Sequence, residues 1–89
     1  MRVRFRVHGR VQGVGFRWHT AEEAQALGLA GWVGNAWDGT VEGEAEGDPA
    51  LLERFRKALQ EGPSMARVSG LDWDAANGGQ SLPLPFDIR

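Results

Sequence analysis

The sequence predicts an α+β fold with elements in the order β-α-β-β-α-β, followed by a short terminal strand, and three observations support it. Val3, Phe5 and Val7 alternate with arginines, as in a strand with one buried face. Two later segments instead place apolar residues at helical spacing. An Asp38-Gly39 pair between two strand-like segments is typical of a hairpin turn.

The expected elements follow one another with little connecting sequence. Phe16 begins a helical stripe that continues through Thr20 and Ala24, and Gly28 is suited to end that helix. Asp48-Pro49 is a typical helix start. In chain order we expect a strand over 2–8, a helix over 16–27 and strands over 29–36 and 40–46. A second helix should then start at Pro49, carry Leu52, Phe55 and Leu59 on its buried face and end at Gly62-Pro63. A strand over 66–74 and a last strand over 86–89 complete the chain.

Right-handed crossovers convert this order into a ferredoxin-like βαββαβ sandwich, an antiparallel sheet covered on one face by two helices, plus a short C-terminal strand. The first and third strands should then be neighbours. Their outward residues would form a ladder of opposite charges, with Arg2, Arg4 and Arg6 facing Glu42, Glu44 and Glu46. The alternative, an RNA-facing sheet, is disfavoured because that face offers glutamates in place of base-stacking aromatics.

Length and composition exclude several classes of protein. The 89 residues predict a single domain, 1–89. With no cysteine, disulfides, thiolate metal sites and a cysteine nucleophile are excluded. There is no signal-peptide pattern and no apolar stretch long enough to cross a membrane, so we expect a cytoplasmic protein. A net charge of −2 argues against a general nucleic-acid partner, and we expect a monomer.

The segment from Gly9 to Arg17 is the strongest functional signal in the chain. Gly13 and Gly15 allow a strand-to-helix turn in which several backbone N–H groups point to one place. The helix N-terminus adds unpaired donors and a partial positive charge. Arg17 adds a guanidinium that can hold two oxygens of a phosphate. Together they predict an oxyanion cradle, the alternative being a plain turn that needed glycines.

At this point a family resemblance becomes specific. The run GRVQGVGFR over 9–17 resembles the signature of the acylphosphatase family. Gly31-Trp32-Val33-Gly34-Asn35, followed by Asp38-Gly39-Thr40-Val41-Glu42, resembles a second pattern of the same enzymes, and the end of the chain is similar to their closing strand. The resemblance implies hydrolysis of a small-molecule acyl phosphate to a carboxylate and inorganic phosphate, without a metal ion or cofactor.

The resemblance also implies the roles of individual residues. Arg17 matches the substrate-binding arginine and Asn35 the catalytic asparagine, which would hold the attacking water. An asparagine suits this task because it is neutral and both donates and accepts hydrogen bonds. The implied phosphate ligands are the backbone amides of Gln12, Gly13, Val14, Gly15, Phe16 and Arg17. The alternative for Asn35 is an ordinary strand-end residue near the turn.

Other candidate residues receive structural interpretations. His8 and His19 have no carboxylate at an obvious pairing offset, and two histidines without cysteines are a poor metal-ligand set. The four tryptophans are interpreted as core or rim packing. Trp37 follows Asn35 by two residues and should point to the same side of the strand, where it could line the pocket and touch the acyl group.

Two other function classes remain open from the sequence. One is a non-catalytic ferredoxin-like module that binds an anion or regulates a partner, which would not need Asn35. The other is an acylphosphatase-like domain of a larger maturation enzyme, which is disfavoured because we expect no linker after the last strand.

Overall fold

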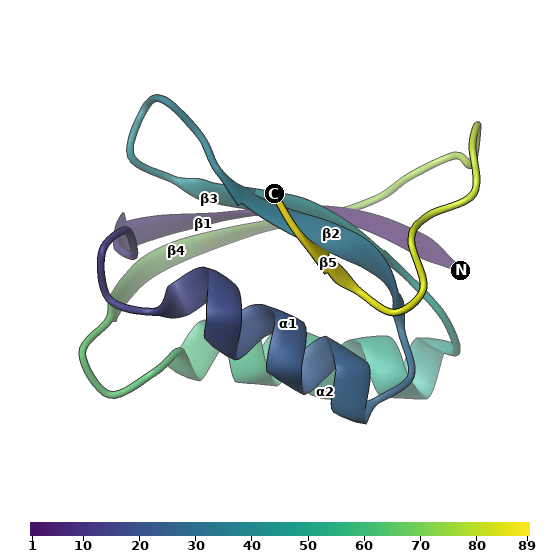
Figure 1. The fold of residues 1–89 in the computed structure, drawn as a ribbon, viewed down its shortest axis with the longest axis horizontal. Helices are drawn as coiled ribbons and strands as arrows, with labels where there is room; N and C mark the ends of the chain where they lie inside the picture. The colour runs from purple at the N-terminus through teal and green to yellow at the C-terminus, as the bar shows by residue number, and fades with distance from the viewer.

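The computed structural model describes residues 1–89 and contains the expected elements in the expected order (Figure 1). Each boundary differs from the expectation by a few residues at most, because fraying ends carry no apolar pattern. The bounds are β1 (Arg2–Arg10), α1 (Phe16–Ala26), β2 (Ala30–Asn35), β3 (Val41–Glu46), α2 (Pro49–Glu61), β4 (Arg67–Ala75) and β5 (Asp87–Ile88).

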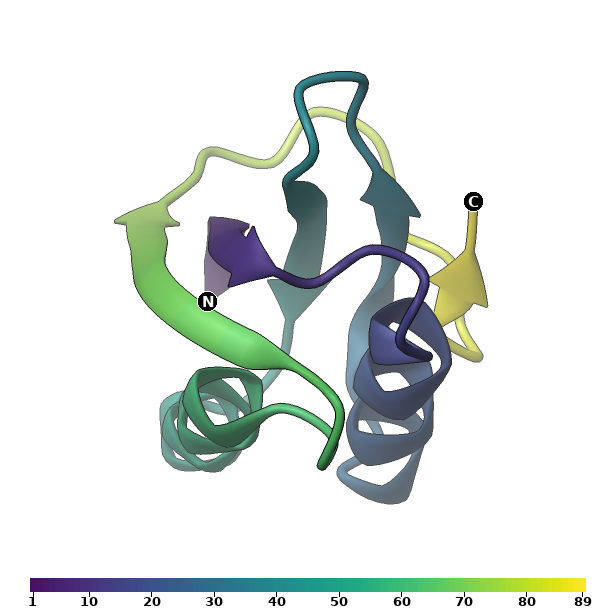
Figure 2. The same cartoon turned by 90° about the vertical axis from the view of Figure 1, so that its left-hand side faces the viewer.

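The strands form one sheet in the order β4-β1-β3-β2-β5, and both helices cover the same face of it (Figures 1 and 2). The first four strands pair antiparallel, which confirms the ferredoxin-like arrangement. The short C-terminal strand expected in addition, β5, pairs parallel to β2 through Trp32 and Val33, so the complete five-stranded sheet is mixed.

The core lies between the sheet and the helices. Phe5, Phe55 and Phe86 are fully buried. The Phe55 ring packs edge to face against both others, with ring-centroid distances of 5.6 Å to Phe5 and 5.8 Å to Phe86. Aromatic pairs of this geometry contribute about 0.5–1.5 kcal/mol beyond the area they bury. Both predicted helical stripes face this core: the buried residues are Phe16, Thr20, Ala21 and Ala24 of α1 and Leu52, Phe55 and Leu59 of α2.

The start of α2 confirms the cap expected from the sequence. The Asp48 side chain accepts a hydrogen bond from the Ala50 amide at 2.8 Å, and Pro49 occupies the first helical position. A cap of this kind contributes about 1 kcal/mol to helix stability. The start of this helix is therefore marked by its own sequence.

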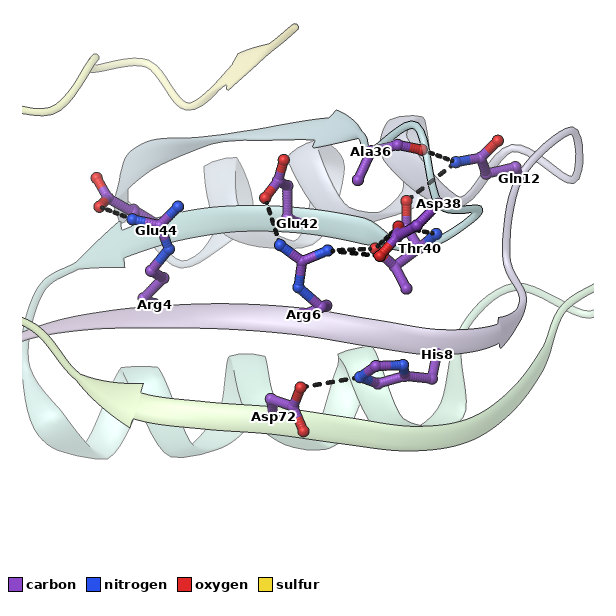
Figure 3. A network of polar contacts seen from close by, with 10 residues as sticks. All are labelled: Arg4, Arg6, His8, Gln12, Ala36, Asp38, Thr40, Glu42, Glu44 and Asp72. Atoms are coloured by element: carbon purple, nitrogen blue, oxygen red, sulfur yellow. Dashed lines mark hydrogen bonds and ion pairs between the residues drawn. The ribbon is translucent and has the colours of Figure 1, made fainter.

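The open face of the sheet carries the predicted charge ladder (Figure 3). Arg2, Arg4 and Arg6 of β1 each face a glutamate of β3, and the register pairs these residues directly. The nitrogen–oxygen distances are 3.3 Å for Arg2–Glu46, 3.7 Å for Arg4–Glu44 and 2.9 Å for Arg6–Glu42. The positive charges of this face are therefore neutralised, which leaves it without the features of an RNA-binding sheet.

Candidate active site

The loop between β1 and α1 and the end of β2 lie at the same end of the molecule (Figures 1 and 2). Between them is a hollow of about 250 Å³, which contains both predicted catalytic side chains, Arg17 and Asn35. The lining is completed by Val11, Gly13, Gly15, Phe16, Trp18 and Ile88. The fold thus brings together two motifs that are separate in the sequence.

The loop has the backbone conformation that the glycines predict. Gly13 and Gly15 have φ angles of 74° and 77°, in the left-handed region that only glycine adopts readily. None of the N–H groups of residues 12–17 donates a hydrogen bond to another backbone group. The first turn of α1 holds no acidic residue and no side chain caps it. These donors are therefore available to an anion.

Arg17 lies on the first turn of α1 and reaches across to β5. Its Nη1 donates a hydrogen bond to the backbone oxygen of Arg89, the residue after β5, at 3.1 Å. Arg89 is held in turn by its amide, which donates to the Val33 carbonyl at 2.7 Å, and by its guanidinium, which lies 4.8 Å from the centre of the Trp32 ring. This contact orients one side of the Arg17 guanidinium and leaves its other donors for a ligand.

Asn35 is the last residue of β2 and is exposed. It pairs with Val41 of β3, and just beyond it the Ala36 amide donates to the Thr40 carbonyl at 2.9 Å. The hairpin that follows is closed by Asp38, which accepts hydrogen bonds from the Thr40 hydroxyl and amide. These hydrogen bonds, together with the nearby Arg6, hold the pKa of Asp38 below its usual range.

The Gln12 side chain joins the two halves of the site, which the sequence did not indicate (Figure 3). Its Nε2 donates to the backbone carbonyl oxygens of Ala36 and Thr40, at 2.7 and 3.0 Å. The cradle is thereby fastened to the hairpin immediately after Asn35. The only sequence signal for this contact is a side chain with two donors inside the glycine loop, and it does not identify the partners.

His8 differs from its sequence interpretation. His8 has a carboxylate partner after all, because its ring forms a 2.8 Å hydrogen bond with Asp72 of β4 (Figure 3). The sequence could not indicate this pair, since 64 residues separate the two. Neither His8 nor His19 lines the hollow.

The interpretation of Trp37 is wrong. Trp37 is 99% exposed, so it packs in no core or rim, and it does not line the hollow. It stands beyond the end of β2, in the turn, where strand alternation no longer sets the direction of side chains. The tryptophan that lines the hollow is Trp18, the residue next to Arg17.

The charge of the hollow favours a negatively charged ligand. Its lining contains one cationic side chain, Arg17, and no aspartate or glutamate side chain. The chain contains no group of three His, Cys, Asp or Glu side chains placed to hold a metal ion, and none of its helices is long and apolar enough to cross a membrane. Fold and site together define a small α+β sandwich with a hollow at a strand-to-helix turn, in which Arg17 and unbonded amides suit an anion.

Comparison with known proteins agrees with this description. The family model described as acylphosphatase matches residues 3–81. The chain is 46% identical over 80 residues to the acylphosphatase of Thermococcus kodakarensis, covering 88% of each protein. It is 38% identical to the solved acylphosphatase of Bacillus subtilis, with a TM-score of 0.84 and coverage of 99% and 97%. It is 35% identical to the solved acylphosphatase of Coxiella burnetii, with a TM-score of 0.87 and coverage of 99% of this chain and 90% of that one. The chain belongs to the acylphosphatase family.

Proposed function

We propose that this chain, acting as a single domain over residues 1–89, hydrolyses acyl phosphates to a carboxylate and inorganic phosphate. The observation that carries the proposal is the shared hollow: a glycine loop with free amides, Arg17 and Asn35 line one site that contains no aspartate or glutamate side chain. A module that only binds an anion would need the loop and Arg17 but has no use for Asn35.

The phosphate group is held by the loop and Arg17. The amides of residues 12–17, namely Gln12, Gly13, Val14, Gly15, Phe16 and Arg17, donate to its oxygens, and the helix dipole of α1 adds a partial positive charge. The Arg17 guanidinium binds two of these oxygens, while the Arg89 backbone oxygen keeps it oriented. The charge of a transferring phosphoryl group is spread over these same oxygens, so the donors also stabilise the transition state.

Asn35 orients the water that attacks phosphorus. Its side-chain oxygen accepts a hydrogen bond from this water and fixes it on the side of the phosphate opposite the leaving group. The bond from the water oxygen to phosphorus forms as the bond from phosphorus to the carboxylate oxygen breaks. The carboxylate leaves with the electron pair, and the water proton passes to a phosphate oxygen. A carboxylate is a good leaving group, so no general base is required from the protein.

The test is hydrolysis of benzoyl phosphate by the purified protein. We expect turnover in wild type and near-complete loss of substrate binding in Arg17→Ala, because a charged bidentate contact disappears. Gln60→Ala, on the exposed side of α2, is the matched control and should behave as wild type. The proposal fails if wild type shows no turnover, or if Arg17→Ala binds and hydrolyses the substrate as wild type does.

A further inference from the structure

The hollow that contains Arg17 and Asn35 has a second, apolar side. Trp18 and Ile88 both line it, and both are unusually exposed for large apolar side chains, at 67% and 41%. Six large apolar side chains are exposed in the whole molecule, and only these two line the hollow. Exposed apolar groups gathered beside an anion cradle indicate a ligand that is charged at one end and apolar at the other.

The apolar surface continues outward from the cradle. Trp18 and Ile88 also line a neighbouring hollow of about 110 Å³, the outer hollow, which follows the seam between α1 and β5. That seam is fixed, because Gln25 of α1 donates a hydrogen bond from its side chain to the Phe86 carbonyl at 2.9 Å. The only charged residue in the outer hollow is Glu22, which would repel a negatively charged ligand group.

We infer that Trp18 and Ile88 form the acyl subsite of this protein and select acyl phosphates with an aromatic or branched aliphatic acyl group. The inference rests on the proposed function, since the cradle fixes which end of the substrate is the phosphate. The leaving carboxylate carries its apolar group across the indole of Trp18. Acyl groups that bear a second carboxylate are disfavoured by Glu22 and by the lack of any cation in the outer hollow.

The direction of Trp18 follows from the helix that carries it. Phe16 and Thr20, two residues away on either side, are buried against the core, so the intervening side chain projects away from the core. Its position next to Arg17 then sets the indole at the rim of the cradle. Placing an aromatic acyl group on it removes apolar surface of both partners from water.

The first experiment compares kcat/KM for benzoyl phosphate and acetyl phosphate. Trp18→Ala should lower the benzoyl-to-acetyl ratio about threefold to tenfold, as expected for the loss of one aromatic contact. The change should lie mainly in KM, because the contact is the same in ground state and transition state. Trp18→Phe should restore most of the ratio. Trp37→Ala, which removes an equally large exposed indole outside the hollow, is the matched control and should leave the ratio unchanged.

A second measurement does not depend on turnover. The dissociation constants of 2-phenylethylphosphonate and propylphosphonate, which carry a phosphonate and no cleavable bond, are compared by calorimetry. Wild type should bind the phenyl compound about threefold to tenfold more tightly, and Trp18→Ala should lose this preference. An equal effect of Trp18→Ala on both compounds, or none on either, overturns the inference. If wild type binds both phosphonates with this preference but hydrolyses neither acyl phosphate, the subsite stands and the proposed function fails.

Discussion

Replacing Gln12 by alanine should uncouple the phosphate cradle from Asn35. The substitution removes two hydrogen bonds, to the carbonyls of Ala36 and Thr40, each worth about 0.5–1.5 kcal/mol net. Both carbonyls keep a backbone donor, the amides of Gly39 and Ala36, so neither is left unsatisfied. We therefore expect the unfolding free energy to fall by about 1–1.5 kcal/mol, near the lower end of the range for two such hydrogen bonds, as measured by urea denaturation.

The effect of this substitution on activity should exceed its effect on stability. A misplacement of about 1 Å between reacting groups can cost about 100-fold in rate, so we expect kcat/KM for benzoyl phosphate to fall about 10- to 100-fold in Gln12→Ala. Because the side chain acts by placing Asn35, the loss should be much smaller when Asn35 is already alanine. Wild-type kcat/KM in Gln12→Ala, or full additivity in the double variant, would refute this role.

Three further predictions concern the cradle, metal independence and the hairpin. Inorganic phosphate should inhibit wild type competitively and Arg17→Ala far more weakly, which inhibition constants measure. Turnover of benzoyl phosphate should be unchanged when a chelator is present, because amides and Arg17 supply the charge stabilisation; a loss that added Mg²⁺ restores would contradict this. The lowered pKa of Asp38 means that its carboxylate stabilises the fold above the ordinary aspartate pKa of about 3.9, and that this contribution is lost as the pH falls through the lowered value. Asp38→Asn should accordingly flatten the acid side of the profile of unfolding free energy against pH, and an unchanged profile would refute the assignment.

The parts of the fold that follow from local chemistry could be predicted from the sequence. The alternation in β1 and the cap residue Asp48 are visible in the local sequence, because a half-buried strand and a capped helix start need few distant partners. The glycine loop is of the same kind, since its conformation depends on Gly13 and Gly15 themselves. The charge ladder followed as soon as the strand order was set.

The features that the sequence could not indicate depend on distant parts of the chain. His8 finds Asp72 only after β4 has returned beside β1. Gln12 reaches carbonyl groups, which every residue carries, so no pattern of side chains marks its partners. The alternation of side chains along a strand predicted that Trp37 lines the hollow, but β2 ends at Asn35 and the rule does not apply beyond it. The tryptophan that does line the hollow, Trp18, lies on a helix, where this rule gives no indication.

In the proposed mechanism, Arg17 binds the phosphate while Asn35 orients the water, and Asn35→Ala tests this assignment. The kcat for benzoyl phosphate and the inhibition constant of inorganic phosphate are measured on the same preparation of this variant. We predict that kcat falls about 100- to 1,000-fold, while the inhibition constant changes less than about twofold. A variant that keeps wild-type kcat, or loses phosphate binding together with turnover, would contradict the assignment of Asn35 to water and of the cradle to phosphate.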